Sequence, residues 1–263
     1  MRTQTIKLNF KVAILIAFSG LFLQSCSSDD DAITYNAPTI SNFEYGEGSI
    51  HSTDQVAFKG SDIHVEAHIE AEAKISSILL SIHSHDLTPG DGEENWGFEK
   101  LYTDSEYLVL NPTFHEHVDV PLNIPAGEYH IELLVTDELG NSTEMDGHLQ
   151  ILDPIILSNI AIDETVVRGT DFHAEFQIYA INKVNSVTVD IHAHGLTPEP
   201  GEVEWDFEEV FQEGYSNQTE VEFHEHIVVP ITAPVGEYHI IFTVEDNDGN
   251  TAEYETHIDV ITN

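Results

Sequence analysis

Cysteine is almost absent from this sequence of 263 residues, which contains a single one, Cys26. One thiol allows no intramolecular disulfide, no thiolate cage around a metal and no cysteine–histidine catalytic pair. Any metal ligands in the chain must therefore come from histidine and carboxylate side chains.

Basic residues are also scarce, with 8 lysines and arginines against 48 aspartates and glutamates. Arg2, Lys7 and Lys11 precede Cys26, so 8 − 3 = 5 basic residues remain after it. Such a surface repels nucleic acid and anionic lipid heads and concentrates cations. We therefore expect no nucleic-acid partner. An acidic balance also keeps a secreted protein soluble, so it identifies no particular cation.

Catalytic motifs are missing as well. The sequence has no GxSxG nucleophile elbow, no P-loop and no HExxH motif. The segment His115-Glu116-His117 is not a metalloprotease motif, because that motif needs two histidines four apart on a helix. No segment shows a sustained helical period. We predict that the protein is not an enzyme, and an enzyme with a metal-bound water is the third and least favoured hypothesis.

The first 25 residues have the features of a secretory signal peptide, with a basic start and an apolar run from Val12 to Leu23 that is too short to span a bilayer. The segment Leu23-Gln24-Ser25-Cys26 resembles the lipobox of bacterial lipoproteins, in which the cysteine is lipidated. This resemblance implies a membrane anchor at Cys26 and an outer membrane lipoprotein, on the cell surface or the periplasmic face. Residues 26–37 read as an acidic tether, whose start resembles the sorting signal of surface-exposed lipoproteins of Bacteroidota.

The remainder of the chain is an internal repeat. Residues of the same type recur 109 positions later, without a gap between Gly60 and Leu152, as in the pairs His83 and His192, Trp96 and Trp205, His115 and His224, and His148 and His257. Such a repeat predicts two tandem domains, 38–152 and 153–263. They meet near Asp153-Pro154, where a proline can end one strand and begin another.

Each copy has the pattern of β-strands throughout. The segment from Ile63 to Ile69 alternates apolar and polar side chains, and similar segments recur between turn signals. A strand, a Gly-Asn turn and another strand close each copy as a hairpin, beginning at Gly127 and Gly236. The predicted fold class is all-β, with two tandem immunoglobulin-like β-sandwich domains after the lipoprotein signal peptide.

Seven histidines recur at the same spacing in both copies. Strand alternation places them on the polar faces, away from the core. They were retained while other exposed positions diverged, which indicates a shared task. They are His64, His83, His85, His115, His117, His130 and His148, matched by His173, His192, His194, His224, His226, His239 and His257.

Metal coordination is the chemistry that these histidines offer. Two histidines two apart on a strand can bend toward one ion at about 2.0–2.1 Å, with a third ligand from the neighbouring strand. Imidazole suits zinc, copper, nickel or iron(II), and we expect zinc or copper. The immunoglobulin strand order predicts two clusters in the first copy: His64, Glu66, His115 and His117 on one sheet, and His83, His85, His130 and His148 on the other. The equivalent predicted ligands in the second copy are His173, Glu175, His192, His194, His224, His226, His239 and His257.

Glu116 is an anomaly within the histidine motif, because alternation places it on the side of Phe114 and Val118. A carboxylate among apolar positions should be hydrogen-bonded or paired. We predict that Glu116, and Glu225 in the second copy, hold a strand end or support a histidine ligand from the second shell.

Several features allow a second interpretation. The histidines could instead form a solvated or pH-responsive surface. The segment Asp246 to Asn250 has some features of a calcium loop, but a turn explains it better. Trp96 and Trp205 could form a platform for a glycan, although a loop anchor folded onto the sandwich is the favoured interpretation.

The motifs HxHxLTP, FHEH(V/I)xVP, GEYHI and D-x-x-G-N occur together with a tryptophan in each copy. As a set they resemble an uncharacterised Bacteroidota family of histidine-containing, immunoglobulin-like lipoprotein domains, over Ile40 to Leu152 and Ile155 to Ile261. Related lipoproteins are encoded near outer-membrane receptors and metal-handling proteins. The resemblance implies metal capture or delivery with an outer-membrane transport partner. The alternative is a structural or adhesive module that binds a protein or a glycan.

Overall fold

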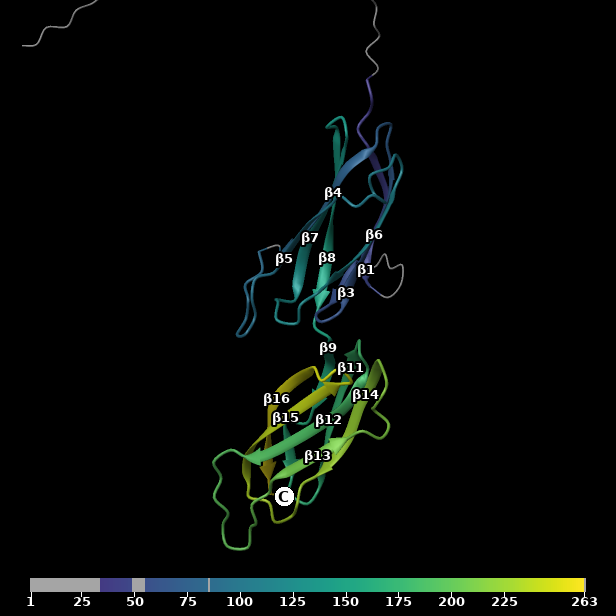
Figure 1. The fold of residues 1–263 in the computed structure, drawn as a ribbon. Helices are drawn as coiled ribbons and strands as arrows, with labels where there is room; N and C mark the ends of the chain where they lie inside the picture. The colour runs from purple at the N-terminus through teal and green to yellow at the C-terminus, as the bar shows by residue number, and fades with distance from the viewer. Residues whose placement is uncertain (1–33, 49–54, 85, 263) are drawn as a thin grey trace, which may run out of the picture. The chain divides into compact units, whose positions relative to one another are not determined.

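The computed structural model describes residues 34–48, 55–84 and 86–262 (Figure 1). The predicted signal peptide, the lipidation site Cys26, the tether up to residue 33 and the predicted ligand His85 lie outside the described residues. Among the residues that the structure does describe, no helix is long and apolar enough to cross a membrane.

Within the described ranges, all regular secondary structure is β-strand. The first copy contains β1 (Thr39–Glu47), β2 (Val56–Phe58), β3 (Asp62–Glu70), β4 (Ile75–Ser84), β5 (Gly97–Tyr102), β6 (Thr113–Asp119), β7 (Gly127–Asp137) and β8 (Ser142–Leu152). The second contains β9 (Ile155–Ile162), β10 (Thr165–Val167), β11 (Asp171–Ala180), β12 (Val184–Ala193), β13 (Phe207–Phe211), β14 (Glu220–Val228), β15 (Gly236–Asp246) and β16 (Thr251–Ile261).

Each copy folds into one three-stranded and one five-stranded sheet (Figure 1). The strand orders are β1-β3-β6 and β2-β8-β7-β4-β5 in the first copy, and β14-β11-β9 and β10-β16-β15-β12-β13 in the second. The short strands β2 and β10 pair in parallel with β8 and β16, and the other pairs are antiparallel. The predicted fold class, two immunoglobulin-like β-sandwiches, is confirmed.

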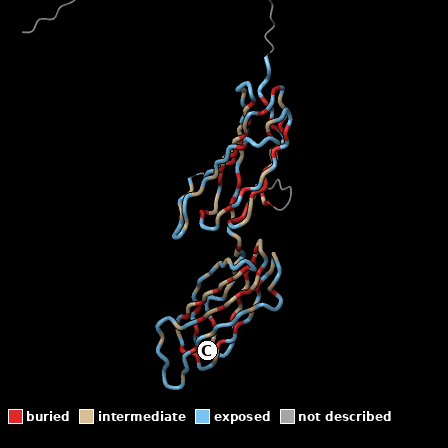
Figure 2. The backbone as a smooth tube through the Cα atoms, viewed as in Figure 1, coloured by how far each residue is buried: buried red, intermediate tan, exposed pale blue. Residues whose placement is uncertain are grey.

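The core of each sandwich comes from alternation along the strands, which is regular on β7 and β15, and Figure 2 shows buried positions within both copies. On β7, the side chains of Tyr129, Ile131, Leu133 and Val135 are all fully buried. They pack with side chains of the three-stranded sheet such as Phe114. Each such side chain contributes about 1.5–3 kcal/mol by leaving water. The polar faces of both sheets are consequently fixed by the burial of the opposite faces.

A tyrosine near the start of β7, and its equivalent in β15, holds the preceding loop in place by a hydrogen bond. The hydroxyl of Tyr129 donates to the carbonyl oxygen of Pro125 at 2.9 Å, and Tyr238 makes the same bond to Pro234 at 3.1 Å. This contact is the tyrosine corner found in immunoglobulin-like domains. The Trp205 ring, 6% exposed, packs 5.0 Å from the Tyr238 ring. Trp205 is therefore a loop anchor, and the partly buried Trp96 packs in the same way 5.6 Å from the Tyr129 ring.

Two of the few basic residues, Lys59 and Arg168, form ion pairs with glutamates in the β4–β5 and β12–β13 connections. The Lys59 ammonium, on a side chain only 8% exposed, lies 2.7 Å from the Glu93 carboxylate. In the second copy Arg168 contacts Glu202 at 2.7 Å. Both partners are retained between the copies, because removing one member of a largely buried ion pair would leave the other charge without compensation.

The D-x-x-G-N segments are turns built around a buried carboxylate. Asp137 Oδ1 accepts hydrogen bonds from the backbone amides of Leu139 and Asn141 at 2.9 and 2.8 Å. The Asn141 side chain donates to the other carboxylate oxygen at 2.9 Å. Burial alone would raise the pKa of Asp137, but these hydrogen bonds outweigh it and hold the pKa below its ordinary value. Asp246 makes the same contacts in the second copy, with the amides of Asp248 and Asn250 and the Asn250 side chain, so the segment from Asp246 to Asn250 is a turn.

We predict that Asp137→Asn lowers the melting temperature at pH 7 by several degrees, because the turn loses its charged acceptor. The folded pKa lies below the unfolded value of about 4, so this stabilisation is fully present above that pH and disappears as the pH falls through the depressed pKa. Thermal melts followed by circular dichroism at pH 7 and pH 3 should therefore show a smaller difference between variant and wild type at pH 3. Glu138→Gln, at the exposed neighbouring position, is the control. Equal melting temperatures for the two variants would contradict this account.

Candidate metal centre

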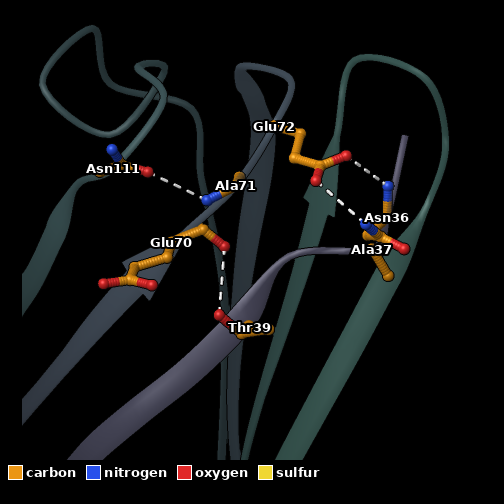
Figure 3. A pocket seen from close by; sticks show the side chains of 7 residues that line it. All are labelled: Asn36, Ala37, Thr39, Glu70, Ala71, Glu72 and Asn111. Atoms are coloured by element: carbon orange, nitrogen blue, oxygen red, sulfur yellow. Dashed lines mark hydrogen bonds between the residues drawn. The ribbon is translucent and has the colours of Figure 1, made fainter. Parts of the chain in front are cut away.

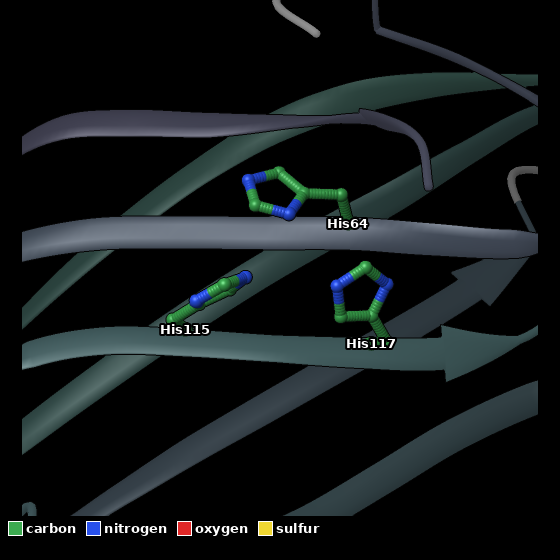
Figure 4. A group of neighbouring side chains, drawn as sticks. All are labelled: His64, His115 and His117. Carbon is green, nitrogen blue, oxygen red and sulfur yellow. The ribbon is translucent and has the colours of Figure 1, made fainter. Parts of the chain in front are cut away.

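The antiparallel register of β3 and β6 brings the first predicted cluster together. His64 lies directly opposite His117, and Glu66 lies directly opposite His115. Residues two apart on a strand share a face, so all four side chains point away from the core. Figure 4 shows the three rings, from two adjacent strands, turned toward a common space. Their centroids lie 4.9, 5.4 and 5.5 Å apart.

The second copy builds the same arrangement on β11 and β14. His173 pairs with His226, and Glu175 pairs with His224. The three ring centroids lie 4.7, 5.3 and 5.7 Å apart. The two triangles are nearly equal in size, although most other exposed positions of the two copies differ.

The size of the first triangle fits one shared ion, and in the second copy the ligand atoms that come equally close belong to His173, Glu175 and His224. Three imidazoles that bind a tetrahedral ion at about 2.0–2.1 Å have ring centres about 5 Å apart and nitrogens about 3.4 Å apart. In the first copy, one nitrogen from each of His64, His115 and His117 lies within 4.8 Å of the others. Small side-chain rotations would bring these nitrogens from within 4.8 Å of one another to the separation of about 3.4 Å that an ion requires. Opposed side chains on paired strands also come to about 5 Å, so the spacing alone does not make a site.

A carboxylate lies beside each triangle. In the second copy, Glu175 Oε2 is 3.4 Å from His173 Nε2 and 3.5 Å from His224 Nδ1. In the first copy, Glu66 Oε2 is 3.9 Å from His64 Nε2, and Oε1 of Glu66 is 3.6 Å from His68 Nε2. Glu175 is therefore in position to be a ligand, whereas Glu66 lies beside the first triangle and closer to His68.

A second carboxylate in each copy holds the far side of a histidine ring. His117 Nδ1 lies 2.5 Å from Asp62 Oδ2, and His226 Nδ1 lies 2.7 Å from Asp171 Oδ2. A carboxylate on Nδ1 fixes the ring and leaves Nε2 as the nitrogen that can face an ion. Sequence reasoning missed these aspartates. The available signal was their place two residues before His64 and His173, on the same strand face.

Space for the Asp62 carboxylate depends on a glycine. A Cβ atom at Gly48 would lie only 2.2 Å from the Asp62 carboxylate carbon. Burial also differs among the ligands: His64 is 3% exposed, whereas the side chains of His117 and His226 are 47% and 58% exposed. The first centre is therefore buried at one ligand and open to solvent at another, whereas in the second centre the equivalent of His64, His173, is itself 30% exposed.

The histidines of the five-stranded sheets form rows. His83, His130 and His148 lie in register on the adjacent strands β4, β7 and β8, with ring centroids 5.4 and 4.6 Å apart. The second copy repeats the row with spacings of 5.1 and 4.9 Å, using His192, His239 and His257. Strands two positions apart are separated by about 10 Å, so the outer rings of a row, such as His192 and His257, cannot share one ion. Of the histidines predicted to cluster on this sheet of the second copy, His194 and His257 do come together, beside Glu237. His85 lies outside the described residues.

Comparison with known proteins identifies the chain's family. A family model matches residues 24–152 and again residues 153–261. The chain belongs to the family described as Domain of unknown function (DUF4625). The predicted resemblance to a family of unknown function in two tandem copies is thus confirmed. No curated protein matches the chain.

Among solved structures, the chain resembles a tetra-tandem repeat from the extending region of a large adhesion protein, with 10% identity, a TM-score of 0.31, and coverage of 86% of this chain and 50% of that one. It also resembles latent PorU from Porphyromonas gingivalis, with 14% identity, a TM-score of 0.30, and coverage of 87% and 20%. A bacterial ice-binding adhesin gives 12% identity, a TM-score of 0.33, and coverage of 88% and 66%. The chain therefore spans half or less of the first two proteins.

The glutamate inside each DUF4625 histidine motif is hydrogen-bonded, as predicted, but its partner is a tyrosine hydroxyl and not a histidine ring. Glu116 accepts a hydrogen bond from the Tyr107 hydroxyl at 2.8 Å, and Glu225 accepts one from Tyr215 at 2.6 Å. Strand alternation puts both glutamates on the side opposite the histidine rings. The carboxylates that support the rings are Asp62 and Asp171, and not the predicted pair. Burial, with the Glu225 hydrogen bond, raises the pKa of Tyr215 to about 12.

A polar cavity of about 600 Å³ lies away from the histidines of the first DUF4625 copy (Figure 3). Its polar atoms already bind one another. The backbone amide and side-chain amide of Asn36 donate to Glu72 at 2.8 and 3.0 Å, and Asn111 accepts from the Ala71 amide at 3.0 Å. The cavity contributes no ligand to the metal centre.

We predict that Tyr215→Phe destabilises the second copy, because the partly buried Glu225 loses a donor, at a cost of about 1–3 kcal/mol. The folded pKa of Tyr215, about 12, lies above the unfolded value of about 10. The stability contributed by its neutral form is therefore complete below pH 10 and lost as the pH rises toward 12. Thermal melts at pH 7 and pH 11.5 should show a large difference between variant and wild type at pH 7 that narrows at pH 11.5. Tyr35→Phe, an exposed tyrosine, is the control. A difference that stays constant with pH would contradict the assignment.

Proposed function

We propose that this protein binds a divalent transition metal, zinc or copper, on the three-stranded sheet of each copy. The observation that carries the proposal is the repeated unit of three imidazoles with an aspartate on the Nδ1 atom of one ring. It occurs with His117 and Asp62 at 2.5 Å, and again with His226 and Asp171 at 2.7 Å. Metal-binding histidines almost always have such a partner on the second nitrogen.

The chemistry of the ligand set favours zinc or copper over calcium or magnesium. Three imidazole nitrogens and one carboxylate suit borderline metals, whereas calcium and magnesium require mainly oxygen ligands. The formal net charge of −40 raises the local concentration of any cation near the chain. This general attraction brings ions to the surface, and the imidazoles select among them.

The openness of the centre favours capture and release over a structural role. A structural zinc site is closed to incoming ligands, whereas His117 and His226 here remain about half exposed, at 47% and 58% of their side-chain surface. Metal bound through exposed ligands can exchange with a partner. We therefore propose metal capture or delivery by a cell-envelope lipoprotein anchored through Cys26, with an outer-membrane transport protein as partner.

Removal of the exposed ligand pair should remove the site. We predict that His115→Ala/His117→Ala and His224→Ala/His226→Ala each reduce the number of tightly bound zinc or copper ions by one, because each pair supplies two of the three imidazoles. Isothermal titration calorimetry of the purified full-length chain measures this directly. Glu116→Gln is the matched control, since its side chain points to the opposite face and should leave the metal affinity unchanged.

Two results would contradict the proposal: affinities weaker than millimolar for both metals, or unchanged binding in both double variants. Either one, combined with a melting temperature that does not respond to metal, would favour the alternative of a structural or adhesive module.

The supporting aspartate provides a separate test that leaves all ligands in place. We predict that Asp171→Asn weakens zinc binding by the second copy about 10–100-fold, because the His226 ring loses the carboxylate that orients it. Asp190→Asn is a closely matched control: Asp190 also contacts a histidine Nδ1, that of His192 at 3.1 Å, but on the other sheet. Equal zinc affinities for the two variants would show that Asp171 does not support a ligand.

A further inference from the structure

A second group of potential ligands lies on the five-stranded sheet of the second copy. His194, Glu237 and His257 each offer one ligand atom, and these atoms lie within 4.8 Å of one another. Nδ1 of His194 is 2.8 Å from a Glu237 carboxylate oxygen. The His194 and His257 rings are stacked at 27°, with centroids 5.6 Å apart. This group is on a different sheet from the centre described above.

The backbone holds the three residues in place. Glu237 and His257 are on the neighbouring strands β15 and β16, where His257 pairs with His239, two residues beyond Glu237. His194 follows the last residue of β12, and its amide donates to the Glu237 carbonyl oxygen at 3.0 Å. All three side chains therefore project from one outward face, and the position of His194 is fixed by the same residue that supplies the carboxylate.

The surroundings of the group favour a cation. A hollow of about 300 Å³ beside His257 is lined by Glu164, Glu237 and Asp259. The first copy retains part of the arrangement, since His148 Nδ1 lies 3.2 Å from the carboxylate of Glu128, which is equivalent to Glu237. The paired imidazole and carboxylate thus recur in the first copy, whereas Gln55 and Gln150 replace Glu164 and Asp259, so the strongly acidic surroundings belong to the second copy alone.

We infer that His194, Glu237 and His257 form a second site for a divalent transition metal, open and readily exchangeable. An ion would take the place of the proton between His194 Nδ1 and Glu237, while the His257 ring supplies the second nitrogen. Two imidazoles and one carboxylate leave the remaining coordination positions to water or to a ligand of another molecule. All three residues are exposed, so the site binds more weakly and exchanges faster than the centre on β11 and β14. It does not depend on that centre.

The test uses the full-length chain carrying His115→Ala, His117→Ala, His224→Ala and His226→Ala, which removes the exposed ligands of both three-stranded-sheet centres. Calorimetric titration with zinc should still detect binding by this background variant. Addition of His194→Ala/His257→Ala should remove one zinc equivalent. His192→Ala, an exposed histidine of the same sheet at the other side of the row, is the matched control and should remove none. A background variant that binds no zinc, or zinc binding that survives loss of His194 and His257, would overturn the inference.

A second measurement uses the unmutated chain, so misfolding of a variant cannot account for its result. Paramagnetic broadening of histidine ring signals by copper(II) in the unmutated chain should be strongest, on this sheet, for His194 and His257 and weaker for His192. The comparison of zinc binding by wild type and background variant then tells failure of the second site from failure of the proposed function. If wild type and background variant bind equal amounts of zinc, the three-stranded-sheet centres fail while the second site stands. If wild-type binding is lost in the background variant, the second site fails while those centres stand.

Discussion

The antiparallel register between β3 and β6, and between β11 and β14, is the constraint on which the candidate centres depend. Burial of alternate residues fixes it, because side chains such as Val65 and Phe114 are completely buried. A shift of one residue would turn every imidazole toward the core and every apolar side chain toward water. The packing energy of the core therefore also sets which donor atoms meet on the outer face, with His64 opposite His117 and Glu66 opposite His115.

Given this register, the same residue type produces two different geometries. On the three-stranded sheet, an edge strand contributes two histidines and its neighbour contributes one, so the rings form a triangle around a point. On the five-stranded sheet, three successive strands each contribute one histidine in register, so the rings form a line. A tetrahedral ion needs convergent donors, which the triangle provides and the row of three does not. Histidine number alone would not have distinguished these two surfaces.

Much of this arrangement could be predicted from the sequence, because burial imposes a period of two on each strand. Alternation alone correctly places His115 and His117 on one face and Glu116 on the other. It gives no information on diagonal contacts between strands, which is why the support of His117 by Asp62 was missed. It also could not separate a triangle from a row, since that requires the order of the strands and the exact residue that faces each histidine. The phenols that bind Glu116 and Glu225 come from Tyr107 and Tyr215, outside the strands to which alternation applies.

The distribution of carboxylates explains how so acidic a chain keeps its imidazoles available. Where an aspartate binds Nδ1, as Asp171 does for His226 at 2.7 Å, the ring is oriented and its other nitrogen points away from the acid. Where a glutamate lies between rings, as Glu175 does near His173 and His224, it can itself be a ligand. The glutamate inside the motif is kept from the rings by strand alternation and by Tyr215. Asp171 thus orients a histidine ring, Glu175 is placed to coordinate an ion, and Glu225 stabilises the fold. The position of each carboxylate relative to the pleat of its strand decides which of these roles it has.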